Sequence, residues 1–576
     1  MPASPGSGTA ESSPAHTRRP RTEYIGPLFD PNYAAGVIPG MTVAIGIWAI
    51  VLFASLGLGT VAAAGSRSSA RHRIWMGFSL IAVTGAAVSL VPPGGVTSLF
   101  RVVVVLTFVV GVGVVIVGRV RSRSQVPGRV ALVITVLVVS LIAAFMALGE
   151  VRNYDTGLYH LQLVALTAAE GTSPGLAQLH DRFGFTSSLW SIGAQLELAS
   201  TPTLGFRLVT GLFLLLFVLE LLHRLMVCSH RASVGTWILA TGSVVLIPYG
   251  LSYAGRTFAG IGQDWIVAVL WLVTTAYLAD WLQYRRRADL AIAIVVAALA
   301  GSVRPFAWVL LVGVLLVGVI YRRSEVRSVA LMWWSAILAG MWLIVTAVRD
   351  ALASGWLLFP LGLLPIPVPW RVDDPGPTAE AVTLWARAPF DMELAETSWD
   401  WFPGWVARVL TDWVVVWLVA LLLLAAVLLT VRRRFARRES SVSGAIIAPL
   451  LVIQMAALAA WFYAAPDPRF GWGPLLALGG LAVAAAAGPG LRQAVVDRGG
   501  WLVWTPLVLV LVSFAFAVVR DPGWWLDRQY AGSPVAVVPL PVADVDIAGD
   551  VARTVGPDDR CWRTAVPCVP WYAGID

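Results

Sequence analysis

The segment RVALVITVLVVSLIAAFMALGEVRNYDTGLYHLQ, residues 129–162, joins a long apolar run to a polar and aromatic stretch. Residues 129–149 are long enough to cross a bilayer as a helix, which takes about 20 mostly apolar residues. After Asp155, Leu158 and Leu161 recur at a helical spacing on one face. The segment therefore predicts a membrane-spanning helix followed by an amphipathic helix along the membrane surface.

Apolar runs of this kind extend along the whole chain. The 576 residues are 58% hydrophobic and only 13% charged, with a mean hydropathy of +0.77, a composition too apolar for a soluble globular domain. The runs predict an all-α polytopic membrane protein with about fourteen transmembrane helices. They lie at residues 41–64, 74–92, 100–118, 129–149, 204–222, 233–250, 264–282, 288–302, 305–321, 329–348, 409–431, 444–464, 470–488 and 501–519.

The basic residues indicate the topology. All 41 are arginine, because the sequence contains no lysine, and this excludes Schiff-base chemistry on a lysine. The net charge of +8 would suggest a nucleic-acid partner in a soluble protein, but here the arginines cluster between apolar runs. If the spans alternate, the arginine-rich internal loops all fall on one side, which the positive-inside rule makes cytoplasmic. Only RRPR at 18–21 disagrees, and no nucleic-acid partner is predicted.

With this topology, the long polar segments between the spans lie on the outer face. The cytoplasmic loops are short and basic, whereas the outer face carries loops 150–203, 251–263 and 349–408 and the tail 520–576. We therefore expect a multi-pass protein of the inner or plasma membrane whose functional site is on the extracytoplasmic face.

The first outer loop holds a polar and aromatic cluster around Asp155. Its other members are Tyr154, Tyr159, His160, His180 and Arg182. An aspartate at the start of a helix can simply cap free N–H groups, but capping does not need such neighbours. Asp155 is thus a candidate catalytic residue with the others as candidate ligands for substrate or phosphate, and capping remains the alternative.

Further candidates lie in the other outer segments. Asp264 opens a span in AGIGQDW, Arg304 lies in the short hairpin GSVRPF, and Arg469 lies in PDPRFGW. Arginines at a membrane surface can bind phosphate, but they can also snorkel to the interface or pair with an acid. Both interpretations stay open for these arginines and for Arg256, and Asp264 can equally cap its helix.

Two other groups of side chains bear on metal and redox chemistry. His160 and His180 can bind a divalent metal together with Asp155, but no zinc motif is present, so a metal cofactor is an alternative rather than the prediction. Cys561 and Cys568 form a disulfide if the tail is extracytoplasmic and are free thiols if it is cytosolic.

Several motifs carry a resemblance to a known family. NYDTGLYHLQ and PGLAQLHDRFGFTSSLW resemble bacterial polytopic membrane proteins from surface-polysaccharide loci, and the resemblance continues in SGWLLFP, PDPRFGWG and CWRTAVPCVP. It covers most of the chain from residue 150 onward. That family looks like a branch of the C-type (GT-C) membrane glycosyltransferases.

The resemblance implies a module in which a span leads to an outer loop that opens with a catalytic aspartate and holds two surface helices. Here Asp155 opens the loop and Asp264 matches a second acidic residue. Two departures are that Tyr154 precedes Asp155 where an Asp-Glu pair is usual, and that an aromatic-Arg-Tyr element is matched only by Arg469-Phe470. The implied parts are a disordered tail (1–39), additional N-terminal transmembrane helices (40–128), a GT-C-like catalytic module (129–348), a large outer loop (349–408), C-terminal transmembrane helices (409–519) and an extracytoplasmic tail (520–576).

Together these observations predict an outward-facing glycosyltransferase of cell-envelope or exopolysaccharide assembly. Nucleotide sugars are cytosolic, so the expected donor is a polyprenyl-phosphate-linked sugar in the membrane lipid, and the expected acceptor is a glycan or a lipid. The alternatives are a polysaccharide polymerase or ligase, and a transporter or flippase. A transporter predicts ionisable residues at mid-membrane, whereas the predicted spans are nearly free of charge at their centres.

Overall fold

The computed structural model describes residues 31–526 apart from 65–67, 122–128, 199–202, 227–232, 322–328, 390, 397 and 436–443. Beyond residue 526 it describes 540–541, 543, 545–548, 551–555, 559–562, 564 and 567–569. Most of the predicted N-terminal tail and parts of the arginine-rich loops therefore lie outside the described residues.

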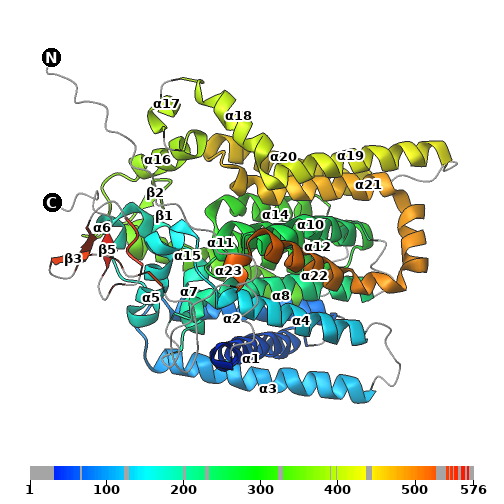
Figure 1. The fold of residues 1–576 in the computed structure, drawn as a ribbon, viewed down its shortest axis with the longest axis horizontal. Helices are drawn as coiled ribbons and strands as arrows, with labels where there is room; N and C mark the ends of the chain where they lie inside the picture. Colours follow the sequence, from blue (N-terminus) through cyan, green and yellow to red (C-terminus); the bar gives the residue numbers. More distant parts are fainter. Residues whose placement is uncertain are drawn as a thin grey trace.

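The described part of the chain is a bundle of long helices (Figure 1). Eleven stretches are long and apolar enough to cross a membrane, which makes the chain an α-helical multi-pass membrane protein. The helices that contain them are α1 (Pro31–Ala62), α3 (Gly95–Arg121), α4 (Arg129–Ala147), α8 (Gly205–Met226), α10 (Val234–Ser252), α12 (Gln263–Tyr284), α15 (Val329–Ser354), α19 (Trp413–Phe435), α20 (Gly444–Ala464), α21 (Trp472–Arg498) and α22 (Thr505–Arg520).

The other three predicted spans also form helices. They are α2 (Ala70–Val88), α13 (Arg287–Val303) and α14 (Trp308–Ile320). The last two are short, with 17 and 13 residues, and α2 begins with the charged sequence Arg71-His72-Arg73. Fourteen spans therefore stay a prediction, beside the eleven helices that satisfy both length and apolarity among the described residues.

The helices differ in how deeply they lie in the bundle. The apolar stretch of α12 is wholly buried, because α8, α10, α13, α20 and α21 pack around it. In contrast, only 6% of the α3 stretch is buried, and α3 runs along one edge of the molecule (Figure 1). An apolar helix with an exposed surface is what a lipid environment stabilises. The N-terminal helices α1 and α2 connect α3 to the central bundle.

Short elements gather at one end of the bundle, on the left in Figure 1. From the first predicted outer loop come the π-helix η3 (Thr156–His160), α5 (Leu161–Glu170), α6 (Leu176–Leu179), the 3-10 helix η4 (Asp181–Gly184) and α7 (Ser188–Leu196). From the second come β1 (Trp356–Leu358), β2 (Leu363–Pro365), α16 (Gly376–Arg387), α17 (Met392–Glu396) and α18 (Trp401–Thr411). The two large predicted outer loops thus meet at the same end.

Smaller elements complete the connections between the long helices. These are α11 (Ala254–Thr257), α23 (Pro522–Leu526) and the 3-10 helices η5 (Pro305–Ala307), η6 (Pro468–Gly471) and η7 (Gly499–Trp504). The prediction of an all-α chain omitted five short strands: β1 pairs with β2, and β3 (Val545–Ala548), β4 (Val551–Thr554) and β5 (Cys568–Val569) form a second sheet.

The C-terminal segment packs on the first outer loop. Cys561 and Cys568 form a disulfide, which is the first of the two alternatives that the sequence left open. The backbone N–H of Trp562 donates to the Gly157 carbonyl at 2.8 Å, and the backbone N–H of Cys568 donates to Gln162 Oε1 at 2.9 Å. Gly157 has little space for a side chain, because a Cβ there would lie 3.1 Å from the Trp562 indole. The described residues around Trp562 and Cys568 are therefore part of the folded structure around η3.

A buried charge cluster lies where α2, α8, α12 and α13 meet. Arg71 pairs with Glu220, Asp280 and Asp289, and Arg224 pairs with Glu220 and Asp280, at distances of 2.6–3.4 Å. Every one of these side chains is at most 1% exposed. Both arginines belong to the runs that indicate the topology, and their burial against acids was not predicted from the sequence. They are the cationic half of a buried ion-pair network, which we call the buried charge cluster.

Candidate active site

Asp155 lies at the junction between α4 and the first outer loop. The preceding residues are held by α11. The backbone N–H of Arg152 donates to the Gly255 carbonyl at 2.8 Å, and Asn153 Nδ2 donates to the Arg256 carbonyl at 3.2 Å. Asp155 stands at the N-cap position of η3, but its side chain makes no capping hydrogen bond. Capping therefore does not occupy the carboxylate. A π-helix next to such a residue is a frequent feature of functional sites.

Arg469 brings three carboxylates together. Its guanidinium nitrogens lie 3.8 Å from Asp155 Oδ2, 3.7 Å from Asp264 Oδ2 and 3.5 Å from Asp467 Oδ1. These distances are ionic contacts longer than hydrogen bonds, and Arg469 Nε has no hydrogen-bond partner among the described residues. The Arg469 guanidinium is thus held by electrostatic attraction to the three carboxylates, and its Nε–H remains available to donate a hydrogen bond.

Arg304 extends this cluster from the other side of Asp264. Its Nη1 lies 2.8 Å from Asp264 Oδ1, and its guanidinium lies over the Phe470 ring at 4.1 Å from the centroid. Asp264 is in the first turn of α12, where a helix favours a negative charge, and the N-cap of that helix is Gly262. Asp155, Arg469, Asp264 and Arg304 therefore form one chain of alternating charge, which we call the charged cluster.

Two cavities meet at the charged cluster. The larger, of about 860 Å³, is lined by Asp155, Asp264 and Arg469 together with Arg182. The smaller, of about 220 Å³, is lined by Asp155, Arg469, Arg182 and Arg304, and aromatic side chains form much of its wall. The larger volume is within the range of small-molecule sites. Seven of the residues predicted from the sequence thus line these two adjacent cavities at the loop-rich end.

Tyr154 and Tyr159 flank Asp155 in different ways. Tyr154 is 50% exposed, lines the larger cavity, and its hydroxyl donates to Asp559 of the C-terminal segment. Tyr159 is buried and lines the smaller cavity. Burial, followed by the negative charge of Asp155, raises the pKa of Tyr159 above its ordinary value. Its phenol is therefore a neutral hydrogen-bonding group rather than a base.

The two histidines lie outside both cavities. His160 is buried against the rings of Tyr159 and Trp190, with centroids 4.4 and 4.5 Å away, and neither ring nitrogen has a hydrogen-bond partner among the described residues. Burial lowers the pKa of His160 to about 4. His180 Nδ1 lies 2.8 Å from Asp181 and accepts from the Arg182 N–H. Neither histidine lines the cavities beside Asp155, and their contact with substrate stays a prediction.

The metal alternative concerns His160, His180 and Asp155. Among the residues that the structure describes, no group of three His, Cys, Asp or Glu side chains is arranged to hold a metal ion. His160, His180 and Asp155 in particular do not form such a group.

The structure adds site residues that the sequence analysis did not single out. The Asp467 carboxylate accepts from the backbone N–H of Arg469 at 3.1 Å and fixes the 3-10 turn η6. Burial raises the pKa of this carboxyl. Trp385 lines both cavities, and the Arg469 guanidinium lies 5.1 Å from its ring centroid. Asp467 stood in the quoted motif PDPRFGW and could have been chosen. Trp385 had no such signal, because only the folding of α16 brings it to Arg469.

The comparison with protein families covers this site. A family model described as a domain of unknown function (DUF8201) matches residues 41–476. The chain belongs to the DUF8201 family. The matched part of this DUF8201 protein includes the whole charged cluster, from Asp155 to Arg469, whereas the segment with Cys561 and Cys568 follows the matched part. No curated protein matches the sequence.

Proposed function

We propose that the chain is a membrane glycosyltransferase, which transfers a sugar from a polyprenyl-phosphate donor to a cell-envelope or exopolysaccharide acceptor on the extracytoplasmic face. One observation carries the proposal. Two carboxylates and two guanidinium groups, Asp155, Asp264, Arg304 and Arg469, border two cavities that share lining residues at the loop-rich end of a membrane bundle. The resemblance to GT-C enzymes supplies the reaction class.

Asp155 is the proposed general base. A sugar hydroxyl that attacks an anomeric carbon must lose its proton, and a carboxylate within about 3 Å can accept that proton, which accelerates such steps by about 10²–10⁴. The Asp155 carboxylate is suited to this role because it is free of capping bonds and borders both cavities. Hydrogen bonds from the Arg152 backbone and the Asn153 side chain, on its N-terminal side, hold it in place.

Arg304 and Arg469 are the proposed ligands of the departing phosphate. The carbon–oxygen bond to the lipid phosphate breaks as the new glycosidic bond forms, so negative charge moves onto the phosphate oxygens. Guanidinium groups bind such oxygens in pairs of hydrogen bonds. The contacts of Arg469 with the three carboxylates, at 3.5–3.8 Å, are long enough for a phosphate to compete with them.

A complementation experiment tests the proposal. A deletion strain is supplied with the wild-type chain, with Asp155→Asn or with Asp373→Asn, and its envelope glycans are analysed. Asp373 is an exposed aspartate that lines neither cavity, so its variant is the matched control. We expect Asp155→Asn to lower transfer by about 10²–10⁴ at an unchanged protein level, while Asp373→Asn complements fully. Full complementation by Asp155→Asn would remove it as the base.

A second measurement separates this function from transport. Purified protein in vesicles is given a polyprenyl-phosphate-linked sugar and an acceptor glycan. A glycosyltransferase forms a new glycosidic bond and releases polyprenyl phosphate, whereas a flippase moves the lipid-linked sugar between leaflets with its bond intact. Movement without bond formation would overturn the proposal.

A further inference from the structure

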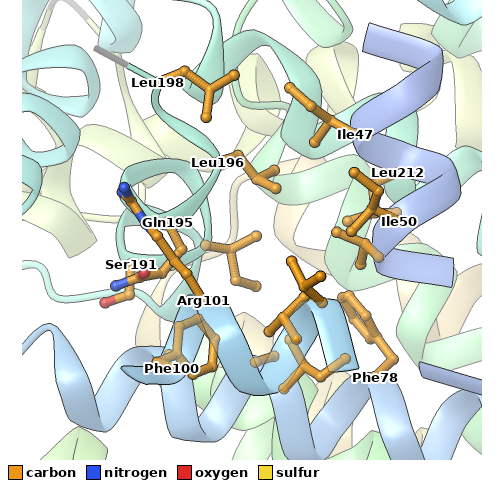
Figure 2. Close-up of a pocket in the computed structure, with 17 residues that line it drawn as sticks. Ile47, Ile50, Phe78, Phe100, Arg101, Ser191, Gln195, Leu196, Leu198 and Leu212 are labelled. Carbon is orange, nitrogen blue, oxygen red and sulfur yellow. The ribbon is translucent and has the colours of Figure 1, made fainter. Parts of the chain in front are cut away.

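A second kind of cavity lies away from the charged cluster, between α1, α2, α3, α7 and α8 (Figure 2). It has a volume of about 220 Å³, and its wall is almost entirely apolar. It shares no lining residue with the two cavities at Asp155. An apolar cavity among membrane helices offers space for a hydrocarbon chain. The residues of the proposed active site take no part in it.

One arginine borders this cavity. Arg101 is the seventh residue of α3, about 9 Å along the axis from the helix start, and it belongs to the apolar stretch Gly95–Val117. Among the described residues its exposed guanidinium has no ion pair and no hydrogen bond. A charged side chain within a membrane stretch is costly unless it meets a partner. The position near the helix end places that partner at head-group depth.

Gln195 is a second polar residue in the cavity wall. Its Nε2 donates to Ser89 Oγ at 2.9 Å, which fixes the amide, while its Oε1 is buried and accepts no hydrogen bond within the described part of the chain. Figure 2 shows Arg101 and Gln195 on one side of the cavity and Ile50 and Leu212 on the other. Arg101 therefore supplies a cation at the border of the apolar space, whereas Gln195 Oε1 is covered by protein atoms.

We propose that this cavity binds an anionic phospholipid. One acyl chain fills the space between α1 and α8, and the phosphate pairs with Arg101. The apolar wall disfavours free inorganic phosphate, which has no chain to bury.

The site has a physical connection to the first outer loop. Its wall includes α7, and Trp190 of that helix packs against Tyr159, which lines the smaller cavity beside Asp155. A lipid bound here therefore supports the helix that packs behind the Asp155 loop. The lipid site itself does not depend on the proposed transferase activity.

Lipid retention by the full chain tests this inference. The wild-type protein is exchanged into bilayers of phosphatidylcholine with a minor fraction of phosphatidylglycerol, extracted in mild detergent, and examined by native mass spectrometry for retained lipid. We expect selective retention of phosphatidylglycerol. Arg101→Gln should lower that retention about tenfold, which corresponds to about 1.4 kcal/mol of binding free energy. Ile50→Trp, which fills the cavity from a partly lipid-facing position, should abolish it.

The control is Arg433→Gln, at an exposed arginine of α19 that does not line the cavity; it should retain the lipid like the wild type. Equal retention of both phospholipids, or retention that Arg101→Gln and Ile50→Trp leave unchanged, would overturn the site. In a parallel arm with polyprenyl phosphate, displacement of phosphatidylglycerol at equal concentration would overturn the choice of lipid. Because Arg101 is exposed and Ile50 partly exposed, both variants are expected to fold.

Discussion

Arg469 is the residue on which the electrostatics of the proposed site depend, because it contacts Asp155, Asp264 and Asp467 at once. Arg469→Gln removes the charge, and we expect glycan transfer to fall by about 10²–10³, as when a positioned donor to a developing anion is lost. Arg469→Lys keeps the charge without the planar fork and should have an intermediate rate. The rates are measured with purified protein, and Arg434→Gln, at an exposed arginine of α19, is the control. Equal rates for Gln and wild type would exclude Arg469 from the reaction.

His160 gives the folded state a dependence on pH. Its pKa is lowered by burial from 6.5 to about 4, so between these values the unfolded chain binds a proton that the folded chain does not. The contribution of His160 to stability is complete above pH 6.5 and is lost as the pH falls toward 4. Over this range the free energy of unfolding falls by up to about 1.4 kcal/mol per pH unit.

His160→Phe should remove this dependence, since it keeps a ring beside Tyr159 and Trp190 and its ring carries no titrating group. The measurement is the thermal unfolding temperature in detergent at pH 7 and pH 5. We expect the wild type to lose more stability than the variant over this interval. Parallel losses in both proteins would contradict a buried neutral histidine.

The sequence identified the charged members of the site better than their neutral neighbours. Asp155, Asp264, Arg304 and Arg469 stand out because charges are rare in this chain and these four fall in predicted outer segments. The burial of His160 could not be predicted, because the sequence does not show that Trp190 of α7 covers its ring. Burial of a single residue depends on partners far away in the chain, and spacing within one loop does not report it.

Among the helices, the buried charge cluster joins the N-terminal α2 to α8, α12 and α13. Asp280 contacts both arginines, with distances of 3.4 Å to Arg71 and 2.7 Å to Arg224. Asp280→Asn leaves part of their charge uncompensated, and breaking a buried pair in this way costs about 3–5 kcal/mol. The measurement is thermal unfolding of the purified protein.

The matched control is Glu150→Gln, which breaks an exposed pair with Arg152 and should cost less than about 1 kcal/mol. A loss for Asp280→Asn no larger than for Glu150→Gln would show that the buried charge cluster contributes little to the packing of α2.

Helices were the most predictable elements, because an apolar run of about 20 residues has few other stable structures in a bilayer. All fourteen predicted runs are helical in the structure. The buried charge cluster was not predicted, since an arginine at a helix end has the same sequence pattern whether it faces water or an acid on another helix. The π-helix η3 and the strands β3 to β5 were also missed, because their hydrogen bonds depend on the C-terminal segment and on single turns.

At the scale of the whole molecule, the predicted outer loops and the C-terminal segment share one end of the bundle (Figure 1). If that end is extracytoplasmic, the Cys561–Cys568 disulfide persists in the cell. A membrane-impermeant maleimide applied to intact cells should then label these cysteines only after reduction. The double variant Cys561→Ser/Cys568→Ser is the control for labelling elsewhere. Labelling of the pair without reduction, or only after the membrane is opened, would place this end on the cytoplasmic side.

The contact between Trp562 and Gly157 has a consequence for the order in which the protein matures. The ribosome makes residues 559–569 after α22, so the loop that carries Asp155 waits for its packing partner through the synthesis of all the helices between them. Trp562 and Cys568 can reach that loop only once α22 is inserted and residues 559–569 have arrived at the same end of the bundle. A chain released after α22 would therefore contain the charged residues of the site, yet would lack the cover over η3. The site is completed by a segment that is made after the long helices described here.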